Sequence, residues 1–231
     1  MSNLFIITGA SSCIGIELLN NLSKRKKDNF ILQVNKNKKK IKENKKITYL
    51  NKKIISCDFS IQKNINLFTA NINKNFFYNN IYFIHLPSSI ITLKKTQNYS
   101  PNQINSQIMI QAISLLLIYK NLLNNNNFNK LKIVIINSEI IDNKIIPGTL
   151  DYSIGKYSLE ALYKNILFDI RNSNKIFVNS IYPTMFNSTL TTNIPNYLKD
   201  KINNKEIIKN IINKIKYLIK NDVSCKDIYI K

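Results

Sequence analysis

Short apolar segments alternate along the chain with longer segments whose apolar residues recur at helical spacing. The short segments are apolar at almost every position and rich in β-branched residues, which is typical of parallel strands buried on both faces. They lie at residues 4–8, 30–34, 47–56, 81–85, 132–137, 176–181 and 228–230. The longer segments predict helices with one buried face, at residues 14–22, 61–77, 102–123, 151–170 and 206–219. This alternation predicts an α/β fold with a doubly wound parallel sheet.

We predict one domain over residues 1–231, because no linker or internal repeat interrupts the pattern. Apolar residues make up 44% of the chain and charged residues 20%, so a sizeable core can form. The longest uniformly apolar run, around residues 113–119, is far shorter than the roughly 18–20 residues that cross a bilayer, and we expect no membrane partner. Three widely spaced cysteines without a CxxC motif predict reduced thiols and a cytoplasmic protein. The lone histidine, His85, cannot support a histidine-rich metal site.

The chain carries 34 lysines and arginines against 13 acidic residues, a formal net charge of +21. An anion- or RNA-binding protein is compatible with this charge, but that interpretation rests on charge alone. Only two of the cations are arginines, and the lysines accompany a large excess of asparagine and isoleucine, whose codons are also A/T-rich. Compositional drift therefore explains the lysines, and we do not expect a nucleic-acid partner. The positive field still favours anionic ligands, such as a phosphorylated cofactor or an acidic carrier protein.

The segment TGASSCIG, residues 8–15, joins the first predicted strand to the first predicted helix. A helix N-terminus offers unpaired N–H groups and a positive dipole end to a pyrophosphate, and glycines let the backbone come close. The position of this segment at the first strand–helix turn therefore predicts a cofactor-phosphate site. Its expected members are Gly9, Ser11, Ser12, Cys13, Ile14 and Gly15.

A tyrosine and a lysine stand four residues apart on a predicted helix, Tyr152 and Lys156 in the segment YSIGK. Positions i and i+4 share one helical face, so both side chains can reach one site. Ser138 stands at the end of the preceding strand, at the edge where open α/β sheets bind ligands.

Taken in chain order, the first turn, Ser138 and the YxxxK pair resemble the short-chain dehydrogenase/reductase superfamily, which has a TGxxxGxG turn. The resemblance covers nearly the whole chain and implies a Rossmann-type fold and an oxidoreductase. Cys13 stands where the family has its middle glycine.

The chemistry of ketone reduction explains this trio. Hydride transfer builds negative charge on the carbonyl oxygen, which Ser138 would stabilise by a hydrogen bond while Tyr152 supplies the proton. An ammonium about 4 Å away contributes on the order of 4 kcal/mol at an effective dielectric of about 20. We therefore expect Lys156 to lower the pKa of Tyr152 from its ordinary value near 10. By the resemblance, Tyr152 and Lys156 also bind the cofactor at the nicotinamide ribose.

Two further polar positions follow from the resemblance. The family has an asparagine in the helix after the fourth strand, part of a water-linked proton relay. Gln111 falls in that position, and Asn105 is the second candidate. The fourth strand ends HLPS, where the family usually has NNAG. We expect His85 to position backbone near the cofactor ribose rather than to act as a catalytic group.

The segment NSIYPTMFNS, residues 179–188, resembles the family's NxxxPG stretch, which closes over the nicotinamide. Thr184 replaces the glycine. By this resemblance the cofactor contacts are Pro183, the backbone of Phe186, and the hydroxyl of Ser188 or Thr189. Asp58, after the third strand, matches the acidic residue that contacts adenine.

The stretch after the second strand, VNKNK at residues 34–38, has no acidic residue to bind a ribose diol. Its positive charge favours a 2′-phosphate, which predicts NADP(H) and the reductive direction. Lys36 is the candidate phosphate contact, although a solvated lysine run explains it equally well.

Length, the trio and the C-terminal pattern are most similar to 3-oxoacyl-[acyl-carrier-protein] reductases, which implies a ketone substrate, small or carried by that acidic protein, in fatty-acid synthesis. The family usually forms dimers or tetramers through its long helices, and the apolar residues 112–118 suit a homo-oligomer. The alternative is a degenerate fold that binds NADP(H) or a partner without turnover. The departures from the family pattern at Cys13, Pro87, Gln111 and Thr184 favour that alternative, whereas the retained trio favours the enzyme.

Overall fold

The computed structural model describes residues 2–72, 77–125, 127–142, 146–184, 186, 188–194 and 204–230. A seven-stranded sheet, in the order β3-β2-β1-β4-β5-β6-β7, forms its centre, and every neighbouring pair is parallel. The strands are β1 (Leu4–Thr8), β2 (Asn29–Val34), β3 (Asn51–Ser56), β4 (Tyr78–His85), β5 (Phe128–Ile136), β6 (Ile176–Pro183) and β7 (Asp227–Ile230). The predicted fold class and all seven predicted strand positions are confirmed.

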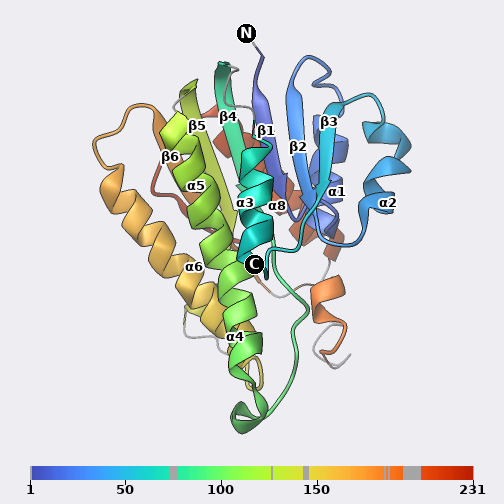
Figure 1. Cartoon of the computed structure of the whole chain (residues 1–231), viewed down its shortest axis with the longest axis vertical. Helices are drawn as coiled ribbons and strands as arrows, with labels where there is room; N and C mark the ends of the chain where they lie inside the picture. The colour runs from blue at the N-terminus through green and yellow to red at the C-terminus, as the bar shows by residue number, and fades with distance from the viewer. Residues whose placement is uncertain are drawn as a thin grey trace.

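Helices cover both faces of the sheet (Figure 1). They are α1 (Cys13–Leu22), α2 (Lys38–Lys42), α3 (Gln62–Ala70), α4 (Pro101–Ile108), α5 (Ser114–Asn125), α6 (Leu150–Asp169) and α8 (Asn204–Lys220). Buried side chains of α1 and α8 form one apolar core against the sheet, and those of α3, α5 and α6 form the other. Strands buried on both faces explain why their sequences are apolar at nearly every position.

One long helical segment contains a change of helical period. A π-helix, η3 (Met109–Ile113), joins α4 to α5 and packs against α6. By length and composition alone, Pro101–Asn125 is long and apolar enough to cross a membrane. The sequence prediction missed this, because it considered only uninterrupted apolar runs. Its buried residues Leu115, Ile118 and Leu122 nevertheless belong to the core beneath the sheet, so in this structure it is a core helix.

Two helix predictions differ from the structure. The helix predicted over residues 61–77 ends at Ala70, and residues 73–76 of that prediction lie outside the described residues. The short helix α2 was not predicted, because its sequence KKKIK buries only Ile41 and shows no apolar period.

The sheet order reverses between β1 and β4, since the chain passes to β2 and β3 on one side and to β5, β6 and β7 on the other. At such a switch point the loops that leave two neighbouring strands diverge to opposite faces, which opens a crevice at the carboxyl edge. The turn after β1 and the segments that follow β4, β5 and β6 all lie at this edge.

Candidate active site

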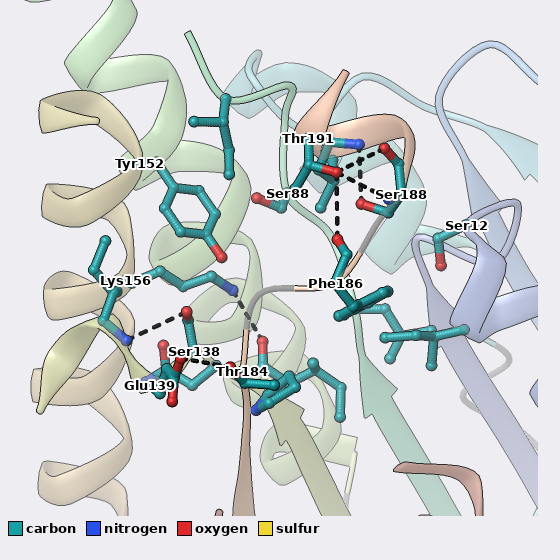
Figure 2. A pocket seen from close by; sticks show the side chains of 18 of the residues that line it. Ser12, Ser88, Ser138, Glu139, Tyr152, Lys156, Thr184, Phe186, Ser188 and Thr191 are labelled. Carbon is teal, nitrogen blue, oxygen red and sulfur yellow. Dashed lines mark hydrogen bonds between the residues drawn. The ribbon is translucent and has the colours of Figure 1, made fainter. Parts of the chain in front are cut away.

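A cavity of about 290 Å³ lies at the carboxyl edge of the sheet. The turn before α1, the segments after β4, β5 and β6, and the first turns of α6 line it. It brings together many of the sequence-predicted site residues, namely Ser12, Cys13, Ile14, Ser138, Tyr152, Lys156, Pro183, Phe186 and Ser188. Figure 2 shows Tyr152, Lys156 and Ser138 on one side of this cavity and Ser12 across it.

The turn that enters α1 is shaped by two glycines. Gly9 adopts φ +66°, a conformation that side chains disfavour, and a Cβ there would lie 3.0 Å from the backbone carbon of Leu86. A Cβ on Gly15 would lie 2.5 Å from the carbonyl oxygen of Ala10. Both glycines are therefore required by the packing of the turn itself.

Only some of the backbone N–H groups of this turn have an oxygen acceptor within the protein. The side chain of Ser12 caps α1 by accepting from the N–H of Gly15 at 3.0 Å. Among the described residues, the N–H groups of Ser11, Cys13 and Ile14 donate to no oxygen. These donors, at the positive end of a helix dipole, suit a pyrophosphate, so the turn fits the dinucleotide that the sequence predicts.

Cys13 occupies the first helical position with ordinary negative φ, so the change from the family's glycine does not strain the backbone. Its side chain lines the cavity. Burial is the largest influence on the Cys13 thiol and raises its pKa, while the N–H groups of Ile14 and of Cys13 itself and the charge of Lys40 act in the opposite direction. The group next to the phosphate site is therefore a neutral thiol at neutral pH.

The three residues predicted to be catalytic come from α6 and from the segment just after β5. Tyr152 and Lys156 lie one turn apart on α6, and the amine of Lys156 is 5.6 Å from the centre of the Tyr152 ring. Lys156 Nζ donates to the carbonyl oxygen of Ile136, the last residue of β5, at 3.0 Å. Ser138 Oγ caps the short helix η4 (Glu139–Ile141) by accepting from the N–H of Ile140 at 3.4 Å, and it also contacts the Tyr152 hydroxyl.

Burial dominates the protonation of this pair. It raises the pKa of Tyr152 to about 12, and the hydrogen bond with Ser138 opposes this only in part. Burial also lowers the pKa of Lys156 to about 7. Our expectation that Lys156 lowers the pKa of Tyr152 is wrong for this structure, because the desolvation of both groups outweighs their attraction and the amine is directed to Ile136.

A contact that the sequence did not reveal links the segments after β5 and β6. The Thr184 hydroxyl donates to Glu139 Oε1 at 2.7 Å, and both residues line the cavity (Figure 2). Thr184 stands where the family has glycine, and its hydroxyl is used to hold the two segments together. The departure from the family pattern was the only sequence signal for this contact.

The segment after β6 meets the segment after β4 above the cavity. The N–H of Ile91 donates to the carbonyl oxygen of Leu190 at 2.9 Å. Ser188 caps the short helix η5 (Thr189–Thr191), its Oγ accepting from the N–H of Leu190 at 3.2 Å. The side chain of Thr189, the alternative hydroxyl contact, lies outside the described residues.

His85 and Gln111 do not line the cavity and contact each other behind it. His85 is 1% exposed; its Nδ1 pairs with the Thr8 hydroxyl at 3.0 Å and its Nε2 donates to the backbone oxygen of Gln111 at 2.8 Å. Burial lowers the pKa of His85 to about 3, so the ring is neutral. The described contacts of this side chain are structural, and the expected place of the His85 backbone near the cofactor ribose stays a prediction.

Gln111 lies in the π-helix and is fully buried. Its Nε2 donates to Gln107 Oε1 at 2.8 Å, and its own Oε1 has no partner among the described residues. The side-chain amide of Gln111 packs against Gly155 of α6, because a Cβ on Gly155 would lie 2.6 Å from Gln111 Nε2. Gly155 immediately precedes Lys156 in the sequence. Asn105, the second candidate for this position, is exposed on α4, and the assignment of the relay position to Gln111 stays a prediction.

The predicted adenine-side residues lie apart from the main cavity. Asp58 lines a separate hollow of about 240 Å³ together with Asn35, at the ends of β2 and β3. Asp58 Oδ1 accepts from the N–H and the hydroxyl of Ser60 at 2.9 and 2.8 Å. Lys36 is exposed just after β2 and lines neither space.

Comparison with known proteins agrees with this geometry. The family model described as short chain dehydrogenase matches residues 3–198. No curated protein matches the sequence.

Solved structures share the fold over almost the whole chain. A short chain dehydrogenase family protein from Francisella tularensis subsp. tularensis SCHU S4 has a TM-score of 0.75 and 18% identity, covering 100% of this chain and 97% of its own. An alcohol dehydrogenase from the archaeon Thermococcus sibiricus, complexed with 5-hydroxy-NADP, has a TM-score of 0.76 and 15% identity, covering 100% and 96%. The angucycline C-6 ketoreductase LanV with bound NADP has a TM-score of 0.77 and 12% identity, covering 98% and 93%.

Proposed function

Because the chain belongs to the short-chain dehydrogenase family, we propose that it is an NADPH-dependent oxidoreductase that reduces a ketone to an alcohol. The observation that carries this proposal is that Ser138, Tyr152 and Lys156 line the same cavity as the N-terminus of α1. The proposed proton donor and oxyanion donor thus line the same cavity as a helix N-terminus suited to a dinucleotide phosphate.

NADPH would be held by the N–H groups before and within the first turn of α1, with Lys36 at the 2′-phosphate and Asp58 at adenine. Pro183, Phe186, Ser188 and the backbone beside His85 complete the proposed contacts. When bound, NADPH supplies a hydride to the ketone carbon. The turn suits this role because Cys13 and Ile14, whose N–H groups donate to no oxygen among the described residues, line the cavity.

Two residues of the chain then stabilise and protonate the carbonyl oxygen of the ketone. The Ser138 hydroxyl donates a hydrogen bond that stabilises the developing negative charge, and Tyr152 delivers its proton to that oxygen. A tyrosine whose pKa is raised to about 12 is fully protonated at neutral pH, which suits a proton donor in the reductive direction.

Lys156 and Gln111 complete the proton delivery. In its charged form the Lys156 ammonium favours the tyrosinate left after proton transfer and binds the cofactor ribose. The unpartnered Gln111 Oε1, buried beside the α6 turn that carries Lys156, supports its proposed place in a water-linked relay to that lysine.

We propose a 3-oxoacyl thioester of acyl carrier protein, in fatty-acid synthesis, as the substrate. The cavity wall is largely apolar, including Ile91, Ile140 and Leu190, which suits an acyl chain. The lysine-rich surface suits an acidic carrier in the cytoplasm.

Tyr157 and Phe168 on α6 are 37% and 66% exposed, and this apolar helix surface supports a homo-oligomer.

The test is to follow NADPH absorbance with an acetoacetyl thioester as acceptor. We expect turnover by the unmodified protein, and a loss of about 10²- to 10⁴-fold in kcat for Tyr152→Phe. NADP⁺ affinity and thermal stability serve as controls and should stay near those of the unmodified protein. Equal turnover by both proteins would remove Tyr152 as the proton donor. NADP⁺ binding without reduction of any ketone tested would instead support the non-catalytic alternative.

A further inference from the structure

A buried glutamine interrupts the otherwise apolar strand β2, whose sequence is NFILQV. Gln33 is 3% exposed and lies on the same face of the strand as the core residue Ile31. A polar side chain buried in this way must find partners, because an unpaired amide costs about 1–3 kcal/mol. Gln33 finds one partner in each of two loops.

The first partner is the turn before α1. Gln33 Oε1 accepts from the N–H of Gly9 at 2.7 Å, and the backbone oxygen of Gln33 accepts from the N–H of Ala10 at 3.0 Å. Gly9 is the residue with φ +66°, so this pair of bonds fixes the orientation of the strained peptide. With these two N–H groups bonded to Gln33, the N–H groups of the turn that donate to no oxygen among the described residues are those of Ser11, Cys13 and Ile14.

The second partner is the exit of β3. Gln33 Nε2 donates to the backbone oxygen of Cys57 at 2.6 Å, immediately before Asp58. The N–H of Cys57 in turn donates to the backbone oxygen of Val34, the neighbour of Gln33, at 2.8 Å. One side chain therefore joins the turn at the proposed pyrophosphate site to the loop at the proposed adenine site.

We propose that Gln33 is a positioning residue for cofactor binding, which holds the phosphate turn and the adenine loop as one unit. This inference rests on the proposed NADP(H) function. An apolar residue would fill the same space, as Ile31 does on the same face, but would leave the Gly9 N–H and the Cys57 carbonyl without partners. Both loops would then be free to turn their peptides away from the geometry that binds the dinucleotide.

The test compares the unmodified protein with Gln33→Met, which keeps the length of the side chain and removes both hydrogen bonds. Ile31→Val is the matched control, because it alters the same face of the same strand and removes no hydrogen bond to either loop. We expect Gln33→Met to raise the Kd of NADP⁺ about tenfold, which corresponds to about 1.4 kcal/mol. Adenosine 2′-phosphate, which lacks the pyrophosphate, should lose affinity as well, because the adenine loop is released with the turn.

Hydrogen exchange of the protein without cofactor gives an independent measurement. The amides of Gly9 and Ala10 should exchange faster in Gln33→Met than in Ile31→Val at matched thermal stability. A Kd for NADP⁺ within twofold of the unmodified protein in Gln33→Met would overturn the inference, as would unchanged affinity for adenosine 2′-phosphate. If the unmodified protein binds no NADP⁺, the proposed function fails, and the exchange of Gly9 alone decides whether Gln33 holds the turn.

Discussion

The two ends of the cavity perform their roles with different parts of the chain. At the proposed catalytic end, side chains carry the chemistry in our proposal, with the hydroxyls of Ser138 and Tyr152 and the amine of Lys156 as the reacting and stabilising groups. At the proposed phosphate end, backbone N–H groups are the proposed ligands, and the side chain of Gln33 hydrogen-bonds to the backbone of the turn. The catalytic end therefore depends on which residues are present, and the phosphate end on which backbone conformations are allowed.

The largest effect is expected at the catalytic end, from Lys156→Met. The variant keeps the apolar stem and removes the ammonium, so kcat should fall by about 10²- to 10⁴-fold. Steady-state kinetics with NADPH and an acetoacetyl thioester measure this loss. Lys164→Met, a change to an exposed lysine two turns further along α6, should leave turnover unchanged and is the control.

Because of Lys156, we expect kcat/KM and the free energy of unfolding to change in opposite directions with pH. The pKa of Lys156 is about 7 in the folded protein, so the ammonium is present below that pH and lost above it. We expect kcat/KM for ketone reduction to fall as the pH rises through about 7, and a flat profile up to about pH 9 would contradict this role.

Stability should change in the other direction. The lowered pKa means that the unfolded chain binds a proton that the folded protein does not between about pH 7 and the ordinary value of 10.5. The free energy of unfolding therefore rises with pH across that window, by about 1.4 kcal/mol per pH unit for this group. Lys156→Met should be more stable than the unmodified protein at pH 7, with a gain in denaturant titrations that shrinks toward about pH 10.

An intermediate effect is expected at the phosphate end from Gly15→Ala. The added Cβ would lie 2.5 Å from the carbonyl oxygen of Ala10, and this backbone atom cannot move without shifting the turn. We expect a loss of about 1–3 kcal/mol in the free energy of unfolding, as for other overpacked sites, together with weaker NADP⁺ binding. Glu17→Ala, at an exposed position of the same helix, controls for helix propensity. Unchanged stability and affinity would show that the turn can relax around the methyl group.

The catalytic end was predictable from the sequence because its geometry follows from local periods. Tyr152 and Lys156 share a face because the helix repeats every 3.6 residues, and Ser138 lies near them because parallel strands end at one edge. The protonation of the pair was not predictable, because it depends on the depth of burial of each group and on the direction that the Lys156 amine takes.

The hydrogen bonds of Gln33 to the proposed phosphate turn could not be predicted from the sequence, for a different reason. Gln33 reaches Gly9 and Cys57, each 24 residues away in the chain, so only the strand pairing brings them together. A polar residue within an apolar strand was a signal that something is bonded there, but not to what. Likewise, His85 Nε2 donates to the backbone oxygen of Gln111, which lies in the π-helix, and no sequence motif predicted that helix.

The smallest effect is expected at Cys13, where the chain departs from its family's glycine. Cys13 has negative φ, and its proposed contact with the phosphates is through its N–H group, which glycine also provides. Cys13→Gly should therefore change the Kd of NADP⁺ by less than about threefold, or about 0.7 kcal/mol. The matched variant Cys13→Asp keeps the side chain small but adds a negative charge beside the phosphates, and should weaken binding more than about tenfold, less so at high salt. If Cys13→Gly instead binds NADP⁺ as poorly as Cys13→Asp, then side-chain identity matters at this end as well, and the contrast between the two ends of the cavity is lost.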